Sequence, residues 1–308
     1  MLSKEALQEL IKAEPRAALV VNTRSRAGRR LYSQALELLA RRGLLLQEVH
    51  PVQDPERLPK IVADAVEQGS NLIIVGGGDG TVSSIVDRVA YRDAVLGILP
   101  LGTSNAFART LSLPLQLPDA VEVIGAGRVA DVDLGVVNGD YFANVASLGL
   151  SAGIAHSIPH RLKRRLGSHA YALVGMGVLV SKEVFHCQVH APEHEIAIDT
   201  RQIVIANGRF VGTALLGPGA HPENRHLGVF DFGKSRLQFL KSWSNYFLGR
   251  NPFLKRTNLI LAPEFHLEAD PPQWIDVDGE IRGQTPATFK VAFDALKVLV
   301  PQDFVELW

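Results

Sequence analysis

A glycine-rich stretch with one aspartate follows the short apolar run Leu72–Val75. It reads Gly76, Gly77, Gly78, Asp79, Gly80 and Thr81. The β-branched run predicts a buried strand, and the residues from Val82 onward predict a helix. Glycines permit positive φ and close approach to a ligand, and the first N–H groups of a helix attract anions. The stretch therefore predicts a phosphate-binding loop in which the Asp79 carboxylate serves Mg²⁺ or proton transfer. The alternative is a plain turn with Asp79 or Thr81 as the helix cap.

Two further polar loops follow predicted strands. One follows Ala17–Asn22 and contains two hydroxyls and two arginines. The other follows Val95–Pro100 and opens a helix. The alternative for this second loop is that Thr103 or Ser104 only caps the helix. Ligands of parallel α/β sheets bind beyond the carboxyl ends of the strands. The predicted nucleotide-binding residues are Asn22, Thr23, Ser25, Gly77, Gly78, Asp79, Gly80, Thr81, Gly102, Thr103 and Asn105.

Two carboxylates lie close together near the end of the chain. Asp278 and Glu280 are two residues apart, so on an extended segment they would point to the same side. Neighbouring carboxylates can separate their pKa values, which favours a general base or a metal ligand. The alternative is a hairpin turn at Asp278 and Gly279 that leaves Glu280 in solvent.

The order of predicted elements indicates two domains in a chain of 308 residues. Residues 1–120 alternate strands with helices, which predicts a parallel-sheet α/β nucleotide-binding domain. Residues 121–300 contain many successive strands, which predicts a mainly antiparallel, β-sandwich-like domain. The tail 301–308 is a candidate to return to the first domain.

Composition narrows the partners and the compartment. With 32 basic and 32 acidic side chains, the chain shows no charge excess for nucleic-acid binding. The single cysteine, Cys187, excludes an internal disulfide, and no signal peptide or membrane-spanning run is present, which predicts a cytoplasmic protein. The basic cluster 160–165 suggests peripheral membrane contact, and edge strands in the second domain leave room for a homodimer.

Three motifs together resemble one known family. They are Gly77–Thr81, Leu99–Arg109 and Val277–Glu280, with similar segments at 131–135, 142–146 and 163–171. In this order they resemble the diacylglycerol kinase-like lipid kinases, which include soluble bacterial diacylglycerol kinases and sphingosine kinases. The resemblance implies ATP and Mg²⁺ as cofactors, a membrane-presented lipid alcohol as substrate, and an active site in the cleft between the domains. It implies that Glu280 or Asp278 is the general base that deprotonates the lipid hydroxyl. In the sphingosine kinase branch, the aspartate that matches Asp79 has this role.

Two departures from the family pattern keep other functions open. The first loop differs from the Asn-Pro and Ser-Gly pattern of many members, and Leu227 stands where bacterial members usually have an aspartate of a structural metal site. The alternatives are an NAD kinase-like phosphotransferase and a non-catalytic regulator that binds nucleotide or lipid. The lipid itself stays open among diacylglycerol, a sphingoid base, a prenyl alcohol and phosphatidylglycerol.

Overall fold

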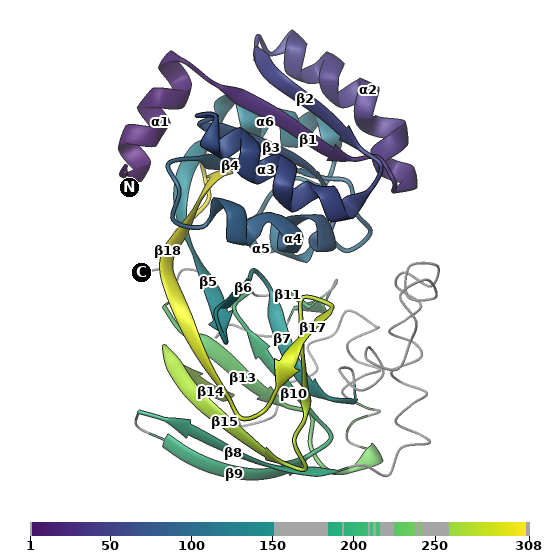
Figure 1. Cartoon of the computed structure of the whole chain (residues 1–308), viewed down its shortest axis with the longest axis vertical. Coiled ribbons are helices and arrows are strands. Elements are labelled where there is room, and N and C mark those ends of the chain that lie inside the picture. The colour runs from purple at the N-terminus through teal and green to yellow at the C-terminus, as the bar shows by residue number, and fades with distance from the viewer. Residues whose placement is uncertain are drawn as a thin grey trace. The chain divides into compact units, whose positions relative to one another are not determined.

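The chain forms two compact units (Figure 1). The computed structural model describes residues 2–150, 184–192, 194–208, 210–211, 214–215, 225–237, 239, 241 and 259–305. The first unit comprises residues 1–134 and 293–308, and the second comprises residues 135–292. The boundary expected at residue 120 falls inside helix α6 (Leu117–Ala126), whose Leu117, Val121 and Ile124 are buried in the core of the first unit. The chain therefore stays in the first unit through the start of strand β5 (Arg128–Val137).

A parallel sheet with helices on both faces makes up the first unit. Its strands follow the order β2, β1, β3, β4 and then the carboxyl-terminal half of β18, which pairs in parallel with β4. This arrangement confirms the predicted α/β class. The elements are α1 (Lys4–Ala13), β1 (Ala17–Asn22), α2 (Arg26–Arg41), β2 (Leu46–Val52), η1 (Pro55–Arg57), α3 (Leu58–Glu67), β3 (Leu72–Gly77), α4 (Asp79–Val89), β4 (Val95–Pro100), α5 (Ala106–Thr110), α6 and β18 (Ala287–Val300).

The strands of this sheet are buried on both faces. Every residue of β3 and β4 is buried, as expected of strands in a parallel sheet that helices cover on two sides. Leu7 of α1, Leu39 of α2 and Val121 of α6 pack in one core with Leu19 and Ile74 of the sheet. Helices α3 and α4 pack against each other and against β1 and β3. Because both faces of the sheet are covered by helices, the loops at the carboxyl ends of its strands are the place where a ligand can bind.

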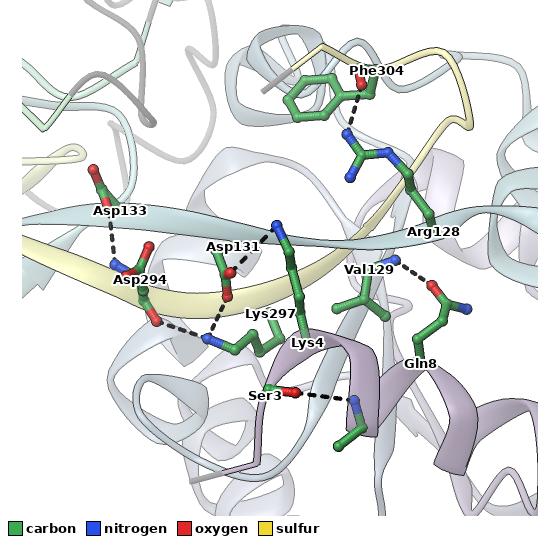
Figure 2. Close-up of polar contacts among 11 residues, drawn as sticks. Ser3, Lys4, Gln8, Arg128, Val129, Asp131, Asp133, Asp294, Lys297 and Phe304 are labelled. Carbon is green, nitrogen blue, oxygen red and sulfur yellow. Dashed lines mark hydrogen bonds and ion pairs between the residues drawn. The ribbon is translucent and has the colours of Figure 1, made fainter. Parts of the chain in front are cut away.

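Ion pairs and hydrogen bonds join the two ends of the chain within the first unit (Figure 2). The Lys297 ammonium on β18 is nearly buried and lies 2.5 Å from the Asp131 carboxylate on β5, and Lys4 of α1 lies 3.6 Å from the same carboxylate. The Arg128 guanidinium donates a 2.6 Å hydrogen bond to the Phe304 carbonyl. A buried cation is stable only when it is paired, so these contacts hold the chain from Phe293 to Phe304 against the first unit.

Two antiparallel sheets form the second unit. One contains the amino-terminal half of β18, then β15, β8 and β9, with the β5–β6 pair beside β18, and the other follows the order β14, β13, β10, β7, β16 and β17. A separate short hairpin joins β11 to β12. The strands are β6 (Asp140–Phe142), β7 (Val145–Gly149), β8 (Phe185–Ala191), β9 (His194–Thr200), β10 (Gln202–Ala206), β11 (Phe210–Val211), β12 (Ala214–Leu215), β13 (Leu227–Asp231), β14 (Leu259–Ala262), β15 (Glu264–Asp270), β16 (Trp274–Val277) and β17 (Glu280–Gln284).

The two sheets bury one shared apolar core, which confirms the predicted β-sandwich. Residues of β8 alternate between buried and exposed, as a strand with one solvent face requires. The rings of Phe265 and Phe289 stack 5.5 Å apart and pack in the same cluster as Leu148 and Ile205 from the other sheet. Leu227 is fully buried in this cluster, so the residue that replaces the family's metal-site aspartate serves the core.

Some predicted segments fall outside the described residues. These are the basic cluster 160–165 and the family-like segment 163–171. Within the described ranges, no helix combines the length and the apolar character needed to cross a bilayer.

The only cysteine of the sequence reports on the sandwich core. Burial, reinforced by the charge of Asp231, raises the pKa of the Cys187 thiol to about 12. Iodoacetamide at pH 8 should therefore label native protein at least about a hundredfold more slowly than guanidinium-unfolded protein, because thiolate is the reactive form. Mass spectrometry of the single thiol measures both rates. Equal rates would contradict the packed core around β8.

Candidate functional site

Three loops meet at the carboxyl edge of the first unit's sheet. Strands β1, β3 and β4 run parallel, with Val21 beside Gly76 and Gly77 beside Pro100, so the segments that follow them emerge together. The register thus brings the three predicted nucleotide loops to one edge, as expected for an open parallel sheet.

The glycine loop is shorter than the sequence predicts. Strand β3 continues through Gly77 and helix α4 begins at Asp79, so Gly78 alone connects the two, and the helix does not wait until Val82. None of the glycines from Gly76 to Gly80 has positive φ. The loop therefore does not use the positive φ that glycine permits. Their missing side chains serve close packing instead.

Close packing explains why Gly77 and Gly78 are glycines, but it does not explain Gly80. A Cβ at Gly77 would collide with the Thr81 side chain, and a Cβ at Gly78 would lie 2.9 Å from the Gly102 Cα of the neighbouring loop. A Cβ at Gly80 would meet no atom within 4 Å. Packing does not require glycine at position 80, whereas a ligand that approaches the α4 N-terminus closely would require it.

The loop after β4 is built around the Asn105 side chain. Asn105 adopts a left-handed conformation with φ of 51°. Its Oδ1 accepts a 2.9 Å hydrogen bond from the Gly102 N–H, and its Nδ2 donates to the carbonyls of Pro100 and Gly102. The Asn105 amide thus holds the loop, and contact with nucleotide through that amide stays a prediction. Thr103 is exposed at the same edge.

Asp79 connects the glycine loop to the loop after β4. It is the first residue of α4, and its Oδ1 accepts a 3.1 Å hydrogen bond from the Phe107 N–H at the start of α5. Burial raises the pKa of the Asp79 carboxyl, although backbone N–H groups of residues 105–107 oppose the shift. The carboxylate is thus bonded to the start of α5. A nucleotide-bound Mg²⁺ is a further candidate partner, because proteins usually hold this ion through one or two carboxylates plus phosphates and waters.

The first loop is tied to the glycine loop. The Asn22 amide donates a 3.0 Å hydrogen bond to the Thr81 hydroxyl. The Ser25 hydroxyl caps α2 by accepting from the Gly28 N–H at 2.9 Å, and it donates to the Asn22 carbonyl. Thr23 is buried, and among the described residues its hydroxyl has no hydrogen-bond partner. Thr23 is therefore better placed than Ser25 to offer a free hydroxyl to a ligand.

Asp278 and Glu280 do not lie on one extended segment. Asp278 and Gly279 form the turn between β16 and β17, with φ values of 46° and 99°, so the extended arrangement is wrong and the hairpin alternative is correct. A turn in which both central residues have positive φ is the usual connection of a tight hairpin. Glu280 begins β17 with an exposed carboxylate 2.8 Å from the Arg282 guanidinium. The two carboxylates therefore occupy different environments.

The Asp278 carboxylate organises the segment between β6 and β7. It accepts hydrogen bonds from the N–H groups of Ala143, Asn144 and Val145 at 2.9, 3.2 and 3.0 Å. From another side, the Asn207 N–H donates to the Asn144 carbonyl at 2.9 Å. Sequence spacing gave no signal for Asn207, because it lies on the loop after β10. Within the described part of the chain, the buried Asn144 Oδ1 accepts no hydrogen bond. These contacts fit a positioning role for Asp278 better than proton transfer.

The charged form of Asp79 should destabilise the native protein at neutral pH. A carboxyl with a raised folded pKa contributes stability that is present below its unfolded pKa and is lost as pH rises through the folded pKa. Asp79→Asn keeps an oxygen for the Phe107 N–H without the charge. We expect it to raise the melting temperature at pH 7.

The matched control is Asp119→Asn, which removes an exposed aspartate from the first turn of α6. Calorimetry should show no rise for this control, and the gain of Asp79→Asn should shrink toward acidic pH. A lower melting temperature for Asp79→Asn at pH 7 would contradict the assigned shift.

Comparisons with known proteins agree with this fold. Residues 16–137 match the diacylglycerol kinase catalytic domain, and residues 144–300 match the YegS C-terminal NAD kinase β-sandwich-like domain. An uncharacterized Synechocystis protein is 31% identical over 82% of this chain and 61% of its own length. A Yersinia pestis protein named as a probable YegS-like lipid kinase is 35% identical over 52% of this chain and 56% of its own length. The chain thus spans less than two thirds of these two relatives.

A solved structure extends the agreement to the fold. The crystal structure of a diacylglycerol kinase from Bacillus anthracis superposes with a TM-score of 0.74, at 21% identity over 94% of this chain and 98% of that one. The two matched domains together run from residue 16 to residue 300. The chain belongs to the diacylglycerol kinase-like lipid kinase family, with a diacylglycerol kinase catalytic domain followed by a YegS-type β-sandwich domain.

Proposed function

We propose that this protein transfers the γ-phosphate of ATP, with Mg²⁺, to the hydroxyl of a lipid alcohol such as diacylglycerol. The observation that carries the proposal is the Asp79 carboxylate, which holds the α5 N-terminus through Phe107 while it starts α4. Two phosphate-binding candidates are thereby locked together beside a carboxylate. Family membership supports the same reaction class.

Phosphoryl transfer depends mainly on alignment and charge neutralisation, because its transition state is loose and negatively charged. The α4 N-terminus at Asp79 and Gly80 would bind phosphate oxygens, and the exposed Thr103 hydroxyl would add a donor at the same edge. When bound, Mg²⁺ would neutralise phosphate charge, and the Asp79 carboxylate is the protein group suited to hold it.

The acceptor hydroxyl must lose its proton, and three carboxylates were candidates for the base. Asp278 is occupied by three backbone N–H groups, which assigns it to positioning residues 143–145. Glu280 has an exposed carboxylate beside the Arg282 guanidinium, and burial raises the pKa of Asp79. We therefore propose Glu280 or Asp79 as the base and Asp278 as a positioning residue.

The test is transfer of label from γ-labelled ATP, with Mg²⁺, into a total lipid extract in mixed micelles, with NAD as a parallel acceptor. Whichever of Glu280→Gln and Asp79→Asn removes the base should lower lipid labelling by about 10²–10⁴-fold, the usual contribution of general acid–base catalysis. Glu264→Gln is the control, since Glu264 is an exposed, ion-paired glutamate of the same unit. Labelled NAD without labelled lipid would assign the chain to the NAD kinase-like class, and bound ATP without any transfer would favour a regulator.

The pH profile separates positioning from proton transfer at Asp278. Asp278→Asn loses hydrogen bonds to a charged acceptor, each worth about 1.5–3 kcal/mol, so its melting temperature and kcat should both fall. The acidic limb of its kcat/KM profile should stay where the unaltered protein has it. If that limb disappears in Asp278→Asn, the carboxylate is the base and the positioning role is wrong.

A further inference from the structure

Residues 143–145 lead from β6 into β7, and all of their backbone polar groups are hydrogen-bonded. Their three N–H groups donate to the Asp278 carboxylate. Their carbonyls accept from the side-chain amide and the N–H of Asn207, from the N–H of Gly208 and from the N–H of Asp278. The backbone of this segment is therefore fixed from two sides.

The Asn144 side chain differs from this backbone. Asn144 is 4% exposed and its Oδ1 is buried, yet no donor among the described residues bonds this oxygen. Asn207 is similarly buried, at 1% exposed, but its amide donates to the Ala143 carbonyl at 3.1 Å. A buried amide oxygen without a donor destabilises the folded protein, so its presence needs a reason.

Ligand binding is a reason that fits the position of Asn144. Its own N–H is bonded to Asp278, in the turn of the β16–β17 hairpin, and β7 lies next to this hairpin in the sheet (Figure 1). Glu280, a candidate base, begins the second strand of the same hairpin. A backbone held rigidly by hydrogen bonds that leave its side chain unused is typical of a binding site, where supporting residues present a polar group to a ligand.

The chemistry of the site favours a neutral hydroxyl over a phosphate. An amide offers both an acceptor and donors, and a hydroxyl is likewise a donor and an acceptor. The charged residues of β6 and of the hairpin are mostly acidic. They are the acidic Asp140, Asp276, Asp278 and Glu280 and the basic Arg282. This excess of negative charge would repel an anionic headgroup.

We propose that the Asn144 amide hydrogen-bonds the hydroxyl of a neutral lipid such as diacylglycerol, the group that receives the phosphate. The inference rests on the proposed function, since it names how the second unit would recognise the lipid alcohol. Oδ1 would accept from the hydroxyl, so the amide oxygen gains its donor when the lipid binds. An analogue without the hydroxyl would leave that oxygen unbonded, and the site would therefore select lipids that carry the group.

The same substitution at two asparagines separates binding from structure. Leucine has nearly the shape of asparagine but no polar atom in its side chain. Asn144→Leu should keep or raise the melting temperature, because it removes an unbonded buried oxygen, whereas Asn207→Leu should lower it, because the Ala143 carbonyl loses its donor. In the micelle labelling assay, Asn144→Leu should lower kcat/KM for dioctanoylglycerol about tenfold, the worth of one hydrogen bond, and leave KM for ATP unchanged.

Calorimetric titration without ATP tests recognition separately from catalysis. The probes are dihexanoylglycerol and the matching dihexanoyl ester of propylene glycol, which lacks only the free hydroxyl. The unaltered protein should bind dihexanoylglycerol about tenfold more tightly than the ester, again the worth of one hydrogen bond. Asn144→Leu should bind the two probes equally.

Any of four results would overturn the proposal. They are no binding of dihexanoylglycerol, equal binding of both probes by the unaltered protein, unchanged discrimination in Asn144→Leu, and a fall in the melting temperature of Asn144→Leu as large as that of Asn207→Leu. Hydroxyl-dependent binding by a protein that labels no lipid would refute the proposed kinase activity and leave the Asn144 site intact. Lipid labelling that Asn144→Leu does not reduce would refute the site and leave the kinase activity intact.

Discussion

The contact between the backbones of Gly78 and Gly102 is the constraint on which the candidate nucleotide site depends. A side chain at either position would separate the loop after β3 from the loop after β4. The contact lets Asp79 reach the Phe107 N–H, so one carboxylate serves two helix starts. The desolvation that raises the pKa of Asp79 follows from the same close packing. Geometry and electrostatics at this edge therefore have one origin.

Polar side chains around this contact mostly stabilise the loops themselves. The Asn105 amide hydrogen-bonds within its own loop, Ser25 caps α2, and Asn22 joins the first loop to Thr81. These bonds position backbone N–H groups and the few groups left over, such as the exposed Thr103 and the buried hydroxyl of Thr23. A rigid edge of this kind suits phosphoryl transfer, in which alignment supplies much of the rate.

In the second unit, too, some polar groups stabilise loops while others stay exposed. Asp278 commits its carboxylate to three N–H groups of residues 143–145, and Asn207 holds that segment from another side. Glu280, two residues along, stays exposed. A structural carboxylate beside an available one explains why two acidic residues occur together in a hairpin. Arg24, Arg26, Arg29 and Arg30 at the start of α2 are the opposite case, because they are charged and exposed and the described residues show no structural role for them.

The sequence by itself determined the fold class and the order of the loops, because β-branched runs, glycines and alternating burial act locally. It also singled out Asp79, since a carboxylate in a glycine-rich phosphate loop is chemically unusual. The local Asp-Gly pair also offered the hairpin turn as an alternative. Tertiary structure alone decided what some of these residues do: Gly78 packs against Gly102, and Asp278 binds backbone N–H groups 133 to 135 positions away. Such contacts join positions far apart in the chain, and no local propensity encodes them.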